Sequence, residues 1–206
     1  MRGGNMTYTQ RFFGHLKTVL THKYWVWRFM CACGYGWHGL WHDMSKFHPT
    51  EFFESVKYYT GTSSPIDACK KDKGISMAWM HHKGRNPHHY EYWMDNFDYG
   101  GVPREMPVKY KVEMLCDYIG AARAYMGDKF SYQAEFDWWI KKLELPRAQH
   151  SNDKDFVTLV LYLLCHFESN VNTEYATSLL RATIVTVLMN FEQMREDFNT
   201  TEGTKT

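Results

Sequence analysis

The sequence lacks several features that would assign it to a common class. It has no long hydrophobic run, since the longest apolar stretch near its end, around residues 156–167, is far too short to span a bilayer. Its beginning lacks the apolar core of a signal peptide. No block of one charge sign stands out, because 24 basic and 23 acidic residues leave a net charge of +1. We therefore expect neither a membrane protein nor a partner for long nucleic acid, while a small anionic substrate is allowed.

Paired cysteines are missing as well. The five cysteines are odd in number and irregular in spacing, and Cys31-Ala32-Cys33 is not the C-x-x-C of a zinc knuckle or a redox turn. The pattern predicts reduced thiols that pack as small hydrophobes, and a cytoplasmic protein.

No stretch alternates convincingly between apolar and polar residues, as a half-buried strand would, so β structure should be minimal. Apolar residues recur instead at helical spacing, as at Phe12, Leu16 and Val19. At 206 residues the chain is most simply one domain. We expect an all-α helical bundle, in which residues 1–128 form the core and residues 129–206 form a helical extension packed on it. The main expected helices cover residues 9–33, 37–46, 51–59, 75–82, 109–126, 153–167 and 174–198.

Histidine is abundant in one part of the chain. Nine of the 11 histidines fall between positions 15 and 89. The most informative is His42, which is followed directly by Asp43, with His22 before the pair and Asp117 after it. Imidazole and carboxylate together are the usual ligands of divalent ions such as Zn, Fe and Mn. A segregated histidine set of this kind indicates a metal site.

Adjacent ligands on one helix pose a geometric problem. Neighbouring side chains point about 100° apart, so His42 and Asp43 can reach one ion only if it lies beyond the helix end or over its edge. A helix that breaks soon afterwards, near His48-Pro49, is compatible with this requirement. An earlier and a later helix would then supply the remaining ligands.

These stretches resemble the HD superfamily of metal-dependent phosphohydrolases. Residues 40–46, Leu-Trp-His-Asp-Met-Ser-Lys, resemble its apolar-His-Asp-apolar-small-Lys core, and Asp117 resembles its late-helix aspartate. Both His22-x-x-x-Val26 and His15-x-x-x-Val19 resemble the start of its first ligand helix; we prefer His22 and leave His15 open. The block from residue 15 to residue 98 also resembles a family of phage and bacterial HD-like proteins without an established function.

The resemblance implies an HD-domain-like fold around one or two divalent ions (Mn, Fe, Zn, Co or Mg). The expected metal ligands are His22, His42, Asp43, His81, His82 and Asp117. The expected catalytic contacts are Asp43, Lys46, Lys83, Arg85, His88 and His89. Glu51 and Glu54 are expected to be solvated helix charges. Lys83 replaces the glutamate of the cyclic-dinucleotide-cleaving branch, which argues against that activity.

The function implied is hydrolysis of a nucleotide or related phosphate ester by metal-activated water. Two alternatives stay open: a non-catalytic helical protein with a structural metal or a partner-binding role, and a di-iron oxygenase on the same scaffold. The expected partner is a small phosphate substrate; a homo-oligomer is also allowed. If the chain is phage-encoded, as the second resemblance suggests, it would act in the host cytoplasm.

Overall fold

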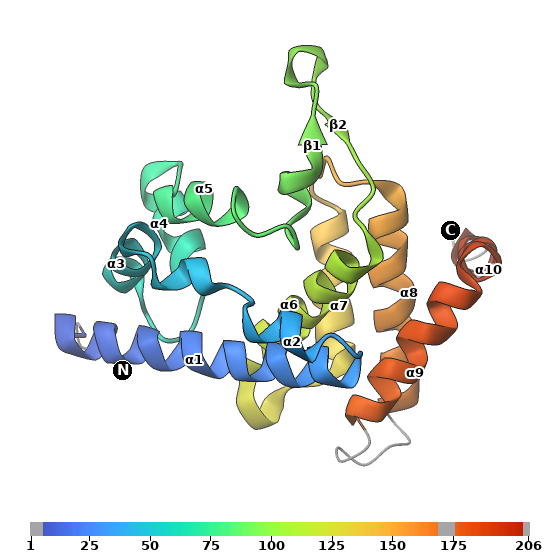
Figure 1. Ribbon diagram of the computed structural model, residues 1–206, viewed down its shortest axis with the longest axis horizontal. Coiled ribbons are helices and arrows are strands. Elements are labelled where there is room, and N and C mark those ends of the chain that lie inside the picture. The colour runs from blue at the N-terminus through green and yellow to red at the C-terminus, as the bar shows by residue number, and fades with distance from the viewer. Residues whose placement is uncertain (1–5, 169–175, 204–206) are drawn as a thin grey trace.

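The computed structural model describes residues 6–168 and 176–203, and the described chain is almost entirely helical (Figure 1). The α-helices are α1 (Tyr8–Ala32), α2 (Gly36–Leu40), α3 (Pro49–Tyr58), α4 (Pro65–Lys73), α5 (Met77–Lys83), α6 (Val108–Met126), α7 (Tyr132–Leu143), α8 (Ser151–Glu168), α9 (Ala176–Met189) and α10 (Phe191–Gly203). Four short 3₁₀ helices are η1 (Met44–Phe47), η2 (Tyr90–Trp93), η3 (Phe97–Tyr99) and η4 (Gly127–Lys129). One antiparallel pair, β1 (Met94–Asp95) with β2 (Val102–Pro103), is the only sheet among the described residues. The all-α expectation is confirmed.

Helix α1 runs horizontally through the lower part of Figure 1. In Figure 1 helices α3, α4 and α5 lie over its N-terminal part, while α6 and the C-terminal helices lie toward its other end, and the β1–β2 arm projects away from both. Helices α1 and α6 pack extensively against each other, and α3 contacts α1, α4 and α5. The space between these two groups of helices is where the histidine-rich segments meet.

The sequence explains why α1 is long and well defined. Thr7 caps it in a capping box with Gln10, which satisfies backbone N–H groups that the first turn leaves unpaired. Its buried residues follow one stripe at spacings of three and four: His15, Val19, His22, Val26, Phe29 and Met30. The stripe changes character along its length, from histidine toward the N-terminus to apolar residues toward the C-terminus.

The apolar core lies at that second end. Val26 of α1 and Leu115 of α6 pack in one buried cluster with Trp139 of α7, Phe156 of α8 and Leu180 of α9. The helices after residue 128 therefore share a core with α1 and α6.

Two of the expected helices are interrupted in the structure. The helix expected over residues 37–46 ends at Leu40, and a turn leads to η1, because Asp43 adopts a left-handed conformation (φ 55°) that no α-helix can contain. The helix expected over residues 174–198 is divided at Asn190, whose side-chain amide donates to the Thr186 carbonyl and competes with continued helical pairing. Positions 174 and 175 lie outside the described residues.

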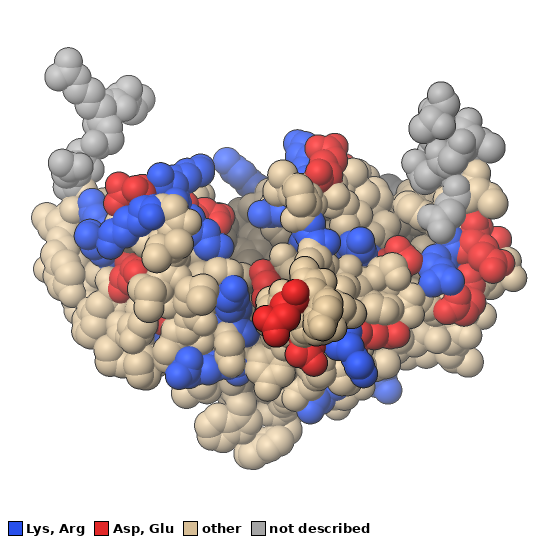
Figure 2. All heavy atoms as spheres, turned by 90° about the horizontal axis from the view of Figure 1, so that it is seen from above, with Lys and Arg blue, Asp and Glu red and all other residues tan. Residues whose placement is uncertain are grey.

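Charge is mixed over the surface. Figure 2 shows Lys and Arg interspersed with Asp and Glu over the face that it views. None of the described helices is both long enough and apolar enough to cross a bilayer.

Helices α1 and α6 approach each other closely at Gly120, where no side chain fits. A Cβ atom on Gly120 would lie 2.5 Å from Val26 Cγ2 and 3.2 Å from the Val26 backbone nitrogen. A side chain there must push the two helices apart.

We therefore predict that Gly120→Val lowers the free energy of unfolding by about 1–3 kcal/mol, as overpacked cores do. Urea denaturation measures the loss. Ala122→Val, at a partly exposed position of the same helix, is the matched control and should cost clearly less. Equal losses in the two variants would contradict the tight α1–α6 contact.

Candidate metal centre

Three segments that are distant in sequence bring four ligand atoms together. His22 comes from α1, His42 and Asp43 from the turn between α2 and η1, and Asp117 from α6. Asp117 Oδ1 lies 3.0 Å from His22 Nε2 and 3.2 Å from His42 Nε2. Asp43 Oδ2 lies 3.4 Å from His22 Nε2 and 3.1 Å from His42 Nε2. We call these four residues group one; all are buried, and their ligand atoms lie within 4.8 Å of one another.

Asp43 also takes part in a second set. Its other oxygen, Oδ1, lies 3.3 Å from His82 Nε2 and 3.4 Å from His88 Nε2. With His89 these residues offer four buried ligand atoms within 4.8 Å of one another, which we call group two. The two oxygens of one carboxylate thus face two different histidine sets.

The backbone at Asp43 makes this arrangement accessible. Its φ of 55° belongs to the left-handed region, which Asp and Asn tolerate better than other non-glycine residues. Because α2 has ended and η1 begins at Met44, His42 and Asp43 are freed from helical spacing. This break solves the geometric problem posed by adjacent ligands, and a strained residue at such a point is typical of a functional site.

Two further carboxylates orient the histidine rings. Glu113 Oε1 lies 3.0 Å from His42 Nδ1 and 3.4 Å from His88 Nδ1, and Glu51 Oε2 lies 2.8 Å from His82 Nδ1. A ring that donates its Nδ1–H to a carboxylate presents the lone pair of Nε2, which is the form that binds a metal ion. In all three histidines that Nε2 atom faces Asp43.

Sequence reasoning missed both orienting residues. Glu51 was expected to be solvated but is 4% exposed. Glu113 was not singled out, although it precedes Asp117 by four residues and so shares its helix face. That spacing was the signal that could have found it. Glu54, also expected to be solvated, accepts from the Ser76 hydroxyl and the Ala78 amide, so it fixes the start of α5.

The electrostatics of the cluster favour added positive charge. Burial would raise the pKa of Asp43 and of Asp117, but neighbouring histidines, and for Asp43 also Lys46, hold both carboxyl pKa values well below normal. Burial would lower the pKa of His42, yet Asp43, Asp117 and Glu113 outweigh it and hold that pKa well above normal. The carboxylates thus draw a proton onto His42, and a divalent ion would take that role by displacing the proton.

Unpartnered atoms agree with this interpretation. His88 Nε2 and His89 Nε2 are buried without a hydrogen-bond partner, and the Asp43 oxygens lie within ion-pair distance of four histidines. Lys46 Nζ forms an ion pair with Asp43 Oδ2 at 2.5 Å. Buried charged groups need a partner to offset their desolvation, and the donor set of imidazole and carboxylate fits a divalent ion.

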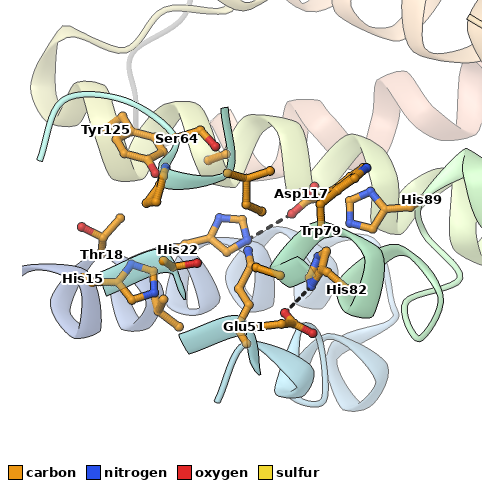
Figure 3. Close-up of a pocket in the computed structure, with 17 residues that line it drawn as sticks. His15, Thr18, His22, Glu51, Ser64, Trp79, His82, His89, Asp117 and Tyr125 are labelled. Atoms are coloured by element: carbon orange, nitrogen blue, oxygen red, sulfur yellow. Dashed lines mark hydrogen bonds and ion pairs between the residues drawn. The ribbon is translucent and has the colours of Figure 1, made fainter. Parts of the chain in front are cut away.

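A pocket of about 210 Å³ opens beside the two groups. Figure 3 shows His15 and Thr18 toward one end of it, Trp79 and His89 toward the other, and His22, Asp117, Glu51 and His82 between them. Apolar side chains, among them Val19, Ile66 and Ala78, complete the lining. The site is therefore open to a small ligand.

The remaining predicted residues do not belong to either ligand group. His81 belongs to neither group: its Nδ1 lies 2.5 Å from Glu51 Oε1, and its ring stacks on His48. Lys83 and Arg85 do not line the pocket, and Arg85 donates to the His81 carbonyl. His15 lines the pocket one heptad before His22 but is not among the ligand groups. Burial, followed by Lys46, lowers the pKa of His15 to about 4, so its ring is neutral near neutral pH.

The comparisons assign a family but no activity. The sequence model of a family of unknown function, DUF5662, matches residues 11–164, well over half of the chain, so the protein belongs to that family. No curated protein matches the chain. No solved structure matches it either. Every residue of groups one and two lies within the matched range.

Metal binding should depend on the orienting carboxylates. We predict that Glu113→Gln weakens binding of Zn²⁺ or Co²⁺ about 10–100-fold, because the rings of His42 and His88 lose their charged partner. Competition with a chromogenic chelator measures the affinity. Glu196→Gln, exposed on α10, should bind like the native protein, and an unchanged affinity in Glu113→Gln would refute the role given to this residue.

Unlike the carboxylate of Asp117, the nearby buried carboxyl group of Glu135 favours its protonated form. Glu135 on α7 is 5% exposed, and burial, with a smaller contribution from Asp117, raises its pKa from 4.5 to about 8. The folded state therefore keeps its proton at pH values where the unfolded state has lost it. The free energy of unfolding therefore has the full contribution of Glu135 below pH 4.5 and loses that contribution as the pH rises to about 8.

Glu135→Gln removes that dependence. Across the window from pH 4.5 to 8, the variant should gain stability relative to the native protein, by on the order of a few kcal/mol at the upper end. Urea midpoints at a series of pH values measure the difference. Glu144→Gln, exposed after α7, should follow the native curve. A difference that does not change with pH would show that Glu135 is ionised in the folded protein.

Proposed function

We propose that this protein is a metal-dependent phosphohydrolase that acts on a nucleotide or a related small phosphate ester. The observation that carries the proposal is the Asp43 carboxylate, which is buried with one oxygen facing each of two histidine groups beside an open pocket. The likeness of residues 40–46 and of Asp117 to the HD superfamily supports the same reaction.

Two divalent ions fit the donor sets better than one. His22, His42, Asp43 and Asp117 would hold the first, and Asp43, His82, His88 and His89 the second, so that Asp43 would bridge them. Ions bound there supply a water of lowered pKa and screen the charge of the phosphoryl oxygens. His22, rather than His15, is the first ligand in this proposal.

The chain's own residues then have separate tasks. Lys46 is the only Lys or Arg among the described residues that line the pocket, and it can pair with a phosphoryl oxygen. Glu51 and Glu113 hold the histidine rings in place. A single basic side chain beside the proposed ions suits a phosphate monoester better than a polyphosphate, whose extra charges would need further partners.

His89 has a smaller part than expected. Burial, then His88 and His82, hold its pKa well below normal, so its ring carries no second proton near neutral pH. A general acid must give a proton at the working pH. We therefore assign His89 to contact with an ion or with substrate, not to protonation of the leaving group.

The alternative of a di-iron oxygenase uses the same two groups, since iron also takes imidazole and carboxylate ligands. Oxygen consumption and an optical spectrum of the iron-loaded protein distinguish it from a hydrolase. A purely structural metal would leave the pocket beside groups one and two without a role.

The test is turnover with defined metals. The chain, stripped and reloaded with Mn²⁺, Fe²⁺, Co²⁺, Zn²⁺ or Mg²⁺, is assayed for phosphate release from nucleoside mono-, di- and triphosphates and cyclic nucleotides. Asp43→Asn keeps the left-handed backbone and removes the charge. It should lower kcat/KM about a thousandfold or more, which corresponds to loss of several kcal/mol of transition-state stabilisation.

His166→Ala, exposed on α8, serves as the matched control for His42→Ala. Native turnover in the control with loss of metal and activity in His42→Ala is the expected pattern. Hydrolysis that survives Asp43→Asn and His42→Ala unchanged would remove the proposal.

A further inference from the structure

A second pocket shares a wall with the candidate metal pocket. It has a volume of about 320 Å³, and Ser64, Ile66, Trp79 and His89 line both. The rings of Trp79 and His89 meet edge to face, with centroids 4.9 Å apart. Figure 3 shows these two side chains together at one end of the metal pocket. The two cavities are therefore neighbours rather than separate features of the surface.

The sizes of the pockets indicate that one ligand extends across both. Pockets for small organic ligands usually measure about 300–1,000 Å³. The metal pocket, at about 210 Å³, lies below that range, whereas the second pocket lies within it. A phosphate group fits the first, and the organic part of an ester needs the second.

Aromatic rings line the second pocket. Trp79, Tyr90, Tyr118 and Trp138 contribute to it, and the rings of Tyr118 and Trp138 pack edge to face at 5.4 Å. Lys70 lies over the Trp79 ring at 4.5 Å. Such walls favour a flat, aromatic ligand, because its faces can stack on the rings.

Two charged groups in this pocket hold atoms without a partner. Arg147 Nη1 and Glu91 Oε2 are both buried without a hydrogen-bond partner, although Arg147 Nη2 donates to the Tyr118 hydroxyl at 3.5 Å, and no ion pair is found between these two described residues. The Tyr90 hydroxyl lies near both groups. Burial and then Glu91 raise its pKa, whereas Arg147 lowers it. A buried polar atom of a charged group that lacks a partner is costly. A matching ligand must offer an acceptor to the guanidinium and a donor to the carboxylate.

The guanine edge has this pattern. Its O6 and N7 atoms are adjacent acceptors that a guanidinium grips with two hydrogen bonds. Its N1–H and N2–H₂ groups are adjacent donors that suit a carboxylate. Adenine offers a single donor group at N6 in place of that pair. Inorganic phosphate would pair with Arg147 and with Lys70 and Lys142, which also line the pocket, but Glu91 and Asp67 would repel it. Of the two ligands, only the guanine edge matches both Arg147 and Glu91.

We propose that the second pocket binds a guanine base through Arg147, Glu91 and the surrounding aromatic rings. The base site stands on its own geometry. Its consequence for substrate, a guanine nucleotide whose phosphate reaches the metal pocket, rests on the proposed function.

Binding of nucleosides tests the site without catalysis. Guanosine, inosine and adenosine are titrated into the full chain after removal of metal, with calorimetry or tryptophan fluorescence as the readout. Guanosine should bind about tenfold or more tightly than adenosine, as bidentate base contacts discriminate. Inosine, which lacks the 2-amino group, should fall between them.

Two variants address the two charged groups. Glu91→Gln keeps the side-chain length but cannot accept from both guanine donors, and Arg147→Lys keeps the charge but not the paired contact. Each should lower guanosine affinity about tenfold and leave adenosine affinity within about twofold. Glu144→Gln and Arg104→Lys, both exposed and outside the pocket, are the matched controls. Melting curves of all four variants establish that they fold.

The outcomes separate this inference from the proposed function. Equal affinity for guanosine and adenosine, or a guanosine preference that survives both variants, overturns the guanine site even if phosphate ester hydrolysis is found. Displacement of guanosine by inorganic phosphate alone, in Asp43→Asn protein without metal, overturns it too. Selective guanosine binding that Glu91→Gln abolishes supports it even if no metal produces turnover.

Discussion

The buried carboxylate of Asp43 sets the main constraint on this structure. It is 1% exposed, its pKa is held well below normal, and an ionised group at that depth is stable only among positive or polarised partners. Four histidines and Lys46 surround it, drawn from α1, α5, the segment after α5 and the turn where Asp43 lies. The helices between these segments are thereby fixed relative to one another. The break after α2 follows from the same constraint, because a continuous helix would separate His42 from Asp43.

Two glutamates extend this arrangement to the rest of the fold. Glu113 ties α6 to His42, His38 and His88, and Glu51 ties α3 to His81 and His82. The apolar core holds α1, α6 and the C-terminal helices, but α3, α4 and α5 contribute nothing to its buried cluster. Apolar contacts outside that cluster also join α3 to α1, since Phe52 packs edge to face against Phe12, and the polar contacts to the histidines add to this connection. Ligands that bind such a site add their binding free energy to folding.

The sequence predicted the identity of the central residues better than their surroundings. His22, His42, Asp43 and Asp117 were foreseen as neighbours because histidine and aspartate at those positions match one metal-binding pattern, and their side chains do meet. The all-α fold was foreseen from helical periodicity. Glu51 looked like a solvated helix charge because nothing local reveals that a helix distant in sequence will cover it. The left-handed backbone at Asp43 was also beyond local reasoning, since the cluster and not the residue's own preference stabilises it.

Lys83 and Arg85 show why charge near a motif is weak evidence for a role. They flank the histidines in sequence, yet the helical geometry of α5 turns His82 inward, and neither basic side chain lines the pocket. His81 and His82 differ for the same reason: consecutive positions on a helix point about 100° apart, so only one can face Asp43. Helical spacing within α5 therefore directs His82, and not His81, toward Asp43.

The wall between the two pockets depends on how α5 is held. At the N-terminus of α5, Ser76 and Ala78 donate hydrogen bonds to Glu54 of α3. At the C-terminus of α5, His82 pairs with Glu51 of α3. Both ends of α5 are thus fixed by carboxylates one turn apart on α3. Trp79 lies between those ends, and its ring also meets His89 and Lys70. Trp79, one of the residues that line both pockets, is thus carried on a helix that the carboxylates orienting the candidate metal ligands also hold.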